Sequence, residues 1–155
     1  MTREELMRRA IELSLRNVAE GGGPFGAVVA RGGEIVAEGV NRVTAQCDPT
    51  AHAEVAAIRA AARKLGTFDL SGCDIYASCE PCPMCLGAIY WARLDRLFYA
   101  ATKDDAARAG FDDAFIYREL ALAPAQRRLA TARLLGDEAL ATFRAWEAKA
   151  DRRPY

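Results

Sequence analysis

Histidine is almost absent from this chain, because His52 is the only one among its 155 residues. Net charge is absent as well, since 21 Lys and Arg residues are balanced by 21 Asp and Glu residues. A protein that binds nucleic acid usually has a basic excess or a basic face, so this balance argues against a large polyanionic partner. The lone histidine means that any metal site with an imidazole ligand must use His52.

Long hydrophobic runs are also missing, and no stretch approaches the roughly 20 apolar residues that span a bilayer. The charged N-terminus lacks the apolar core of a signal peptide, so we expect a cytoplasmic protein with no membrane partner. Because the cytoplasm is reducing, the five cysteines are expected to be free thiols or metal ligands. The length and the 52% hydrophobic fraction fit a single globular domain over residues 1–155.

Apolar periodicity and turn residues predict helices that alternate with strands. Thr2 and Glu5 have the spacing of a capping box, and Gly21-Gly22-Gly23 is interpreted as a chain reversal, not a phosphate loop. The first helix should bury an apolar face of Leu6, Ala10, Leu13 and Val18.

The predicted helices cover residues 2–20, 48–64, 83–92, 104–119 (with a break at Gly110), 124–134 and 137–149. The predicted strands cover residues 27–30, 34–38, 74–78 and 96–100, and Arg31-Gly32-Gly33 is a predicted tight turn that pairs the first two. This alternation indicates an α/β sheet with helices on both faces.

Two motifs about thirty residues apart carry the chemistry. His52 and Glu54 lie in Thr-Ala-His-Ala-Glu, and Cys82 and Cys85 lie in Glu-Pro-Cys-Pro-Met-Cys. One imidazole and two thiolates would hold one Zn²⁺ per subunit and leave a fourth position for water or hydroxide. Glu54 is two residues from His52, off the ligand face of a regular helix, which suits a general base beside that water. His-x-Glu followed by Pro-Cys-x-x-Cys is a known signature of zinc-dependent nucleobase deaminases.

The same residues allow other interpretations. His-x-Glu alone is common in helices, and Pro-Cys-x-x-Cys alone fits a redox pair or half of a zinc knuckle. If Cys79 also bound the metal, the site would be closed and structural. The protein would then be a zinc-stabilised interaction domain with no use for Glu54. Cys47 and Cys73 are most simply small core or surface thiols.

Longer segments carry a resemblance to a known family. Residues 24–29, Asn41, residues 48–54 and residues 78–89 resemble the cytidine deaminase superfamily. Within it, the chain is most similar to the bacterial guanine deaminases, by segments at residues 90–93, 98–101 and 109–117 and by Tyr155. The resemblance implies a three-layer α/β/α fold with a central mixed five-stranded sheet, and a homodimer. It also implies hydrolytic loss of the 2-amino group of guanine, giving xanthine and ammonia in purine catabolism.

The resemblance further implies roles for individual residues. Glu54 and Asp113 would be catalytic, and Asp113 would also contact the base. The residues that would bind substrate are Phe25, Asn41, Ala53, Trp91, Asp113 and Tyr155. The C-terminal helix and tail, residues 137–155, would close over an active site, in some members that of the partner subunit.

Each of these residues also has a simpler interpretation. Phe25 and Trp91 are by default core aromatics, and Asn41 fits a turn after a strand. Asp113 and its neighbour Asp112 fit a solvated pair or a helix cap, which leaves open which of the two is functional. Tyr155 alone would be read as a frayed terminus.

Two rival activities share the metal motifs. A tRNA adenosine deaminase would use the same residues but should present a basic face, which the balanced charge disfavours. A deaminase of cytosine, of a guanosine-type nucleoside or of an aminotriazine such as ammeline would differ only in its pocket. Pocket changes of one methylene alter discrimination by only about 10–200-fold, so such promiscuity is plausible.

Overall fold

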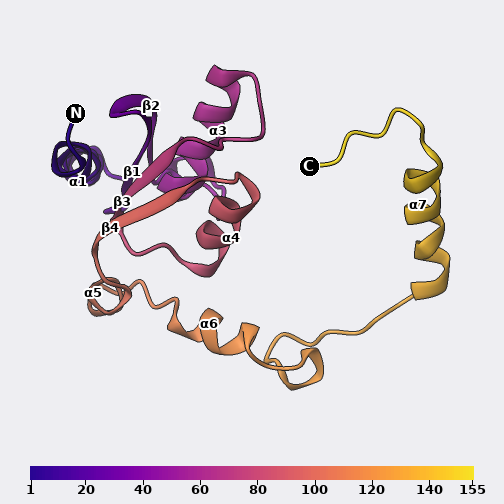
Figure 1. Ribbon diagram of the computed structural model, residues 1–155. Helices are drawn as coiled ribbons and strands as arrows, with labels where there is room; N and C mark the ends of the chain where they lie inside the picture. The colour runs from indigo at the N-terminus through magenta and orange to yellow at the C-terminus, as the bar shows by residue number, and fades with distance from the viewer. The chain divides into compact units, whose positions relative to one another are not determined.

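The computed structural model describes residues 1–155 and divides them into two compact units, Met1–Ala114 and Phe115–Tyr155. The first unit holds all the strands of the chain (Figure 1). Its elements in chain order are α1 (Arg3–Ala19), β1 (Gly26–Arg31), β2 (Glu34–Val40), α2 (Val43–Gln46), α3 (Ala53–Leu65), β3 (Asp74–Cys79), α4 (Pro83–Trp91), β4 (Arg96–Ala101) and α5 (Lys103–Arg108).

The sheet is mixed and has the strand order β2-β1-β3-β4. Strand β1 pairs antiparallel with both β2 and β3, whereas β3 and β4 run parallel. The expectation of five strands is wrong for this chain, which has four. After β4 the backbone forms helices, one 3₁₀ turn and connecting segments, so no later segment pairs with β4, which remains an edge strand.

A two-residue turn joins β1 to β2, as the sequence predicted. Arg31 pairs with Glu34, and the two residues between them, Gly32 and Gly33, have φ of 58° and 85°. Positive φ at both central positions matches the twist of a hairpin and favours glycine.

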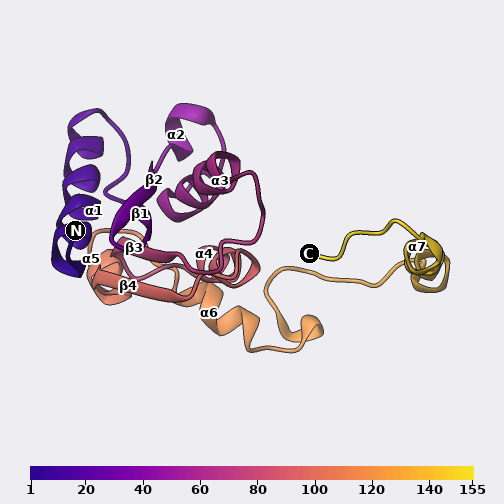
Figure 2. The same ribbon diagram turned by 45° about the horizontal axis from the view of Figure 1, so that its top comes forward.

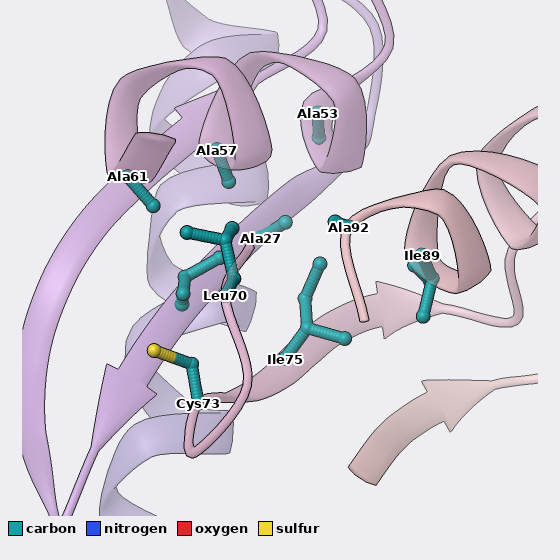
Figure 3. Packing of buried hydrophobic residues seen from close by; sticks show 10 residues of the cluster. Ala27, Ala53, Ala57, Ala61, Leu70, Cys73, Ile75, Ile89 and Ala92 are labelled. Carbon is teal, nitrogen blue, oxygen red and sulfur yellow. The ribbon is translucent and has the colours of Figure 1, made fainter. Parts of the chain in front are cut away.

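Alternating residues of β1 build a separate core on each face of the sheet, which gives three layers. Val28 and Ala30 pack with the inward face of α1, around Leu13. Ala27 and Val29 pack on the other face with residues of α3 and α4, including Ile89 (Figure 3). Figure 2 shows α1 on one side of the strands and α3 on the other. The three-layer α/β/α expectation is therefore confirmed.

Helix α1 confirms one detail of the prediction and corrects another. Thr2 and Glu5 form the capping box, with both reciprocal hydrogen bonds present. Val18 is 50% exposed, so its place in the predicted apolar face is wrong. The buried stripe ends instead on Asn17, whose side chain is 1% exposed.

The second helix starts later than predicted. Helix α3 begins at Ala53, and the carboxylate of Asp48 accepts hydrogen bonds from Thr50 N (2.8 Å) and Thr50 Oγ1 (2.7 Å). Aspartate in such a local turn competes with helix formation. The delay of five residues makes His52 the N-cap residue of α3.

The second unit contains α6 (Ala114–Leu120, which starts on the last residue of the first unit), a 3₁₀ turn (Pro124–Gln126) and α7 (Gly136–Ala148). The predicted helix over residues 124–134 is wrong beyond that turn. Beyond the turn, Arg128 N donates to the Glu119 carboxylate at 2.8 Å and not to the carbonyl four residues earlier, as a helix would require. No helix of the chain has the length and apolar character needed to cross a membrane.

We expect Gly39→Ala to destabilise the first unit by about 1–3 kcal/mol, as overpacking does. A Cβ at Gly39 would lie 2.2 Å from Ala53 O and 2.5 Å from Ala57 N, so β2 and the start of α3 would be forced apart. Gly87→Ala is the matched control, because a Cβ there meets nothing within 4 Å and favours the helix. Thermal unfolding should show a lower Tm for the first variant only. Equal Tm values would contradict this account of the close approach.

Candidate metal centre and active site

Two helix starts bring the three predicted metal ligands together. His52 is the N-cap residue of α3, Cys82 is the N-cap residue of α4, and Cys85 lies in the first turn of α4. His52 Nδ1 is 3.6 Å from Cys82 Sγ and 3.4 Å from Cys85 Sγ. All three potential ligand atoms lie within 4.8 Å of one another. The two sequence motifs therefore meet in the structure as one cluster of three potential metal ligands.

The geometry of this cluster fits zinc. Zinc–sulfur and zinc–nitrogen bonds of about 2.3 and 2.0 Å, meeting at a tetrahedral angle, place nitrogen and sulfur about 3.5 Å apart. The two observed nitrogen–sulfur distances, 3.4 and 3.6 Å, bracket that value. Cys79 is not part of the cluster, because its thiol donates to Thr102 O at 3.5 Å. Three protein ligands fit an open site better than a closed structural one.

The thiols and the imidazole influence one another. A hydrogen bond from Cys85, helped by His52, lowers the pKa of Cys82 well below its usual range, which favours the thiolate form. The same hydrogen bond, together with burial, raises the pKa of Cys85. The hydrogen bond to Cys82 in turn raises the pKa of His52. The positive end of a helix also favours thiolates, so the two cysteines at the start of α4 are suited to ionise and bind a metal cation.

Glu54 lies beside the cluster without belonging to it. Its side chain is in the first turn of α3, is 7% exposed, and accepts a hydrogen bond from Cys85 Sγ at Oε2 (3.4 Å). Burial raises the pKa of this carboxyl. A buried carboxylate next to a metal cluster is placed to accept and return a proton.

Of the two adjacent aspartates, Asp113 faces the site. Its Oδ1 is buried and has no hydrogen-bond partner, and burial followed by the charge of Cys82 raises its pKa. Asp112 instead accepts a hydrogen bond from Ala114 N at 3.0 Å, in a turn before α6. Asp113, and not Asp112, therefore has a buried, unpaired carboxylate oxygen and a pKa that responds to the charge of Cys82.

Phe25 and Asn41 are brought towards His52 by backbone pairing. Asn41 N donates to Phe25 O at 3.2 Å, and the next residue donates from its backbone to Ala51 O at 2.9 Å, directly before His52. The Phe25 ring meets the Phe111 ring edge-on, with centroids 5.0 Å apart. The two aromatic rings therefore connect this segment to the loop that carries Asp113.

The remaining predicted substrate residues are placed less directly. The Ala53 side chain packs in the core, so only its backbone, at the start of α3, is available to a ligand (Figure 3). Trp91 ends α4, roughly 9 Å along the helix from Cys85, and is 68% exposed. The first unit does not bring Trp91 into the cluster, and Tyr155 belongs to the second unit.

One residue of the site region was missed from the sequence. The Glu80 carboxylate accepts a hydrogen bond from Lys103 N at 3.0 Å, and its backbone N donates to Ala101 O at 2.8 Å. These bonds fix the loop that carries Cys82 to the start of α5. The signal available in the sequence was a glutamate directly before the Pro-Cys motif, where its carboxylate is not needed as a metal ligand.

Comparison with known proteins adds independent findings. The sequence model of the cytidine and deoxycytidylate deaminase zinc-binding region matches residues 1–101. The chain is 51% identical over 156 residues to a guanine deaminase of Bacillus subtilis, covering 100% of both proteins. An X-ray structure of guanine deaminase from Bacillus subtilis matches with a TM-score of 0.97 and 51% identity, covering 100% of this chain and 99% of that one. A tRNA-specific adenosine deaminase of Aquifex aeolicus is 38% identical over 101 residues, 65% of this chain and 67% of the relative.

We expect His52→Ala to abolish stoichiometric zinc binding, because the chain has no second histidine to replace it. Cys79→Ala is the control, since its thiol contacts Thr102 and not the cluster. Elemental analysis of purified protein should give one zinc per chain for the wild type and for Cys79→Ala. Loss of zinc from the Cys79 variant would show that the site is closed and structural.

Proposed function

The chain belongs to the cytidine and deoxycytidylate deaminase family, and we propose that it is a zinc-dependent guanine deaminase, which hydrolyses guanine to xanthine and ammonia in purine catabolism. The observation that carries the proposal is similarity to a guanine deaminase over the entire chain. Similarity to the tRNA-specific adenosine deaminase covers 65% of the chain and so leaves about a third of it unaccounted for.

His52, Cys82 and Cys85 would hold the zinc ion, since their ligand atoms already lie at suitable separations. When bound, zinc would supply Lewis-acid activation of a water molecule at neutral pH. His52 and Cys82 are only half-buried, which leaves one side of the cluster accessible to a small molecule.

Glu54 would move the protons. Its carboxylate takes a proton from the attacking water and delivers it to the ring nitrogen beside C2. The water oxygen bonds to C2, which becomes tetrahedral and carries a hydroxyl and an amino group. The hydroxyl proton then passes through Glu54 to the amine, the bond from C2 to the amino nitrogen breaks, and C2=O forms, which gives ammonia and xanthine. Asp113 has a free buried carboxylate oxygen, which suits a contact to the base and a second proton transfer.

Phe25 and Asn41 would recognise the purine. The face of an aromatic ring is suited to stacking on a flat heterocycle, and an amide donates and accepts at once, as the amide edge of guanine does. The backbone N–H of Ala53, in the first turn of α3, has no partner within the helix and would offer a further donor.

We further propose a homodimer, which would complete the pocket. Helix α4 contains no charged residue, yet Tyr90 and Trp91 are 77% and 68% exposed. A helix that is apolar on all sides is normally buried, so a second copy of the chain would cover the exposed side chains of Tyr90 and Trp91.

Residues 137–155, including Tyr155, would close over an active site, with that of the partner subunit as one option. The protein would act in the cytoplasm, because thiolate ligands need a reducing compartment.

A substrate screen tests the proposal. The zinc-loaded protein should release ammonia from guanine faster than from guanosine, adenine, cytosine or ammeline, with xanthine as the chromatographic product. Rapid turnover of another base with none of guanine would overturn the substrate assignment. Inosine formation in a folded tRNA, together with silence on all free bases, would establish the tRNA deaminase alternative.

We expect Glu54→Gln to retain one zinc per chain and to lose guanine turnover by at least about 10²–10⁴-fold, the usual contribution of a general base. The amide keeps the shape of the side chain but cannot accept the proton from water. Zinc content and initial rates should be measured on the same preparation. Near-normal turnover would remove Glu54 from the mechanism.

A further inference from the structure

A polar side chain ends the buried stripe of α1. Asn17 is 1% exposed and lies one helical turn beyond Leu13. Most residues that face inward from this helix are apolar, and a buried amide is costly unless its polar atoms are hydrogen-bonded. Its Oδ1 is nevertheless buried and without a partner. Burial of Asn17 therefore carries a cost at Oδ1 that the hydrogen bonds of its amide nitrogen have to offset.

The amide nitrogen of Asn17 joins two segments that are distant in the sequence. Nδ2 donates to Gly23 O at 2.8 Å and to Asn41 O at 2.9 Å, which uses both of its hydrogens. Gly23 O also accepts from Phe25 N at 2.9 Å, and Phe25 O accepts from Asn41 N at 3.2 Å. These four bonds form a closed ring that fixes Asn41 on both sides of its backbone and fixes Phe25 with it.

Two of the three glycines before Pro24, Gly22 and Gly23, pack closely against this ring. A Cβ at Gly22 would lie 2.4 Å from Asn17 Nδ2, and a Cβ at Gly23 would lie 3.0 Å from the side chain of Asn41. Gly22 N also donates to Asn17 O at 2.8 Å. The chain reversal predicted from these glycines therefore encloses the Asn17 amide.

We propose that Asn17 is a positioning residue for substrate, which acts through Asn41 and Phe25 without touching the base. This inference rests on the proposed guanine deaminase activity and names the interior contact that sets its pocket. The Asn41 side chain receives one hydrogen bond through Oδ1, from Val43 N at 3.3 Å. Its direction depends on the backbone that Asn17 holds, so loss of the Asn17 bonds would misdirect the amide that meets the purine edge.

The test is the kinetics of Asn17→Leu, which keeps the branched shape of the side chain and removes both donors. We expect the KM for guanine to rise about tenfold, as when one hydrogen bond to a substrate edge is weakened, with kcat changed less than about threefold and zinc content unchanged. In an Asn41→Ala background the same substitution should change KM much less, because the part of its effect that passes through Asn41 is already lost.

Ser14→Ala is the matched control. Ser14 is also buried on the inner side of α1, but its hydroxyl donates to Ile11 O within the same helix and has no link to Asn41. Its KM should equal that of the wild type. Gly22→Ala provides a second route if Asn17→Leu fails to fold, since its methyl presses on the Asn17 amide and should raise KM in the same way.

The outcomes are distinguishable. An unchanged KM in folded Asn17→Leu or Gly22→Ala, or a KM effect that persists unchanged without the Asn41 amide, overturns the positioning role alone while wild-type guanine turnover stands. No guanine turnover by the zinc-loaded wild type overturns the proposed function, and the positioning role with it.

Discussion

The meeting of two helix N-termini determines the rest of this structure. His52 and Cys82 are N-cap residues of α3 and α4, and neither side chain makes a capping hydrogen bond. Serine, threonine, asparagine or aspartate in such positions is usually worth about 0.5–2 kcal/mol. Both side chains instead lie in the cluster proposed to hold zinc, with the N-terminal ends of both helices directed at one point. The sheet serves this arrangement, because β3 leads into α4 and β2 packs closely on the start of α3 through Gly39.

Local chemistry made much of the fold predictable. The capping box of α1, the glycine hairpin and the four strands follow from residues close together in the sequence, and they were confirmed. The errors arose where tertiary packing decides. Asp48 resembles a helix cap but closes a local turn, and residues 124–134 favour a helix in composition but Arg128 N bonds to the Glu119 carboxylate. The missing fifth strand is of the same kind, because a strand exists only through its partner.

The candidate site, like the fold, was predicted in part from the sequence. The sequence alone located His52, Cys82 and Cys85, because their two motifs have the spacing of a known zinc-binding signature. Asn17 was not found, since nothing in the sequence separates a buried asparagine from an exposed one near a helix end, and Val18 fitted the apolar face equally well. The choice between Asp112 and Asp113 likewise required coordinates. The proposed metal ligands are thus recognisable from two short motifs, whereas the position of Asn41 depends on contacts between distant segments.

The central claim is an open zinc site with three protein ligands, and zinc K-edge X-ray absorption tests it most directly. The account predicts two sulfur scatterers at about 2.3 Å and two nitrogen or oxygen scatterers at about 2.0 Å, one from His52 and one from solvent. Addition of guanine should perturb the oxygen shell and leave the sulfur shell unchanged. A third sulfur in the first shell would contradict the account, because it would make the site closed and the zinc structural.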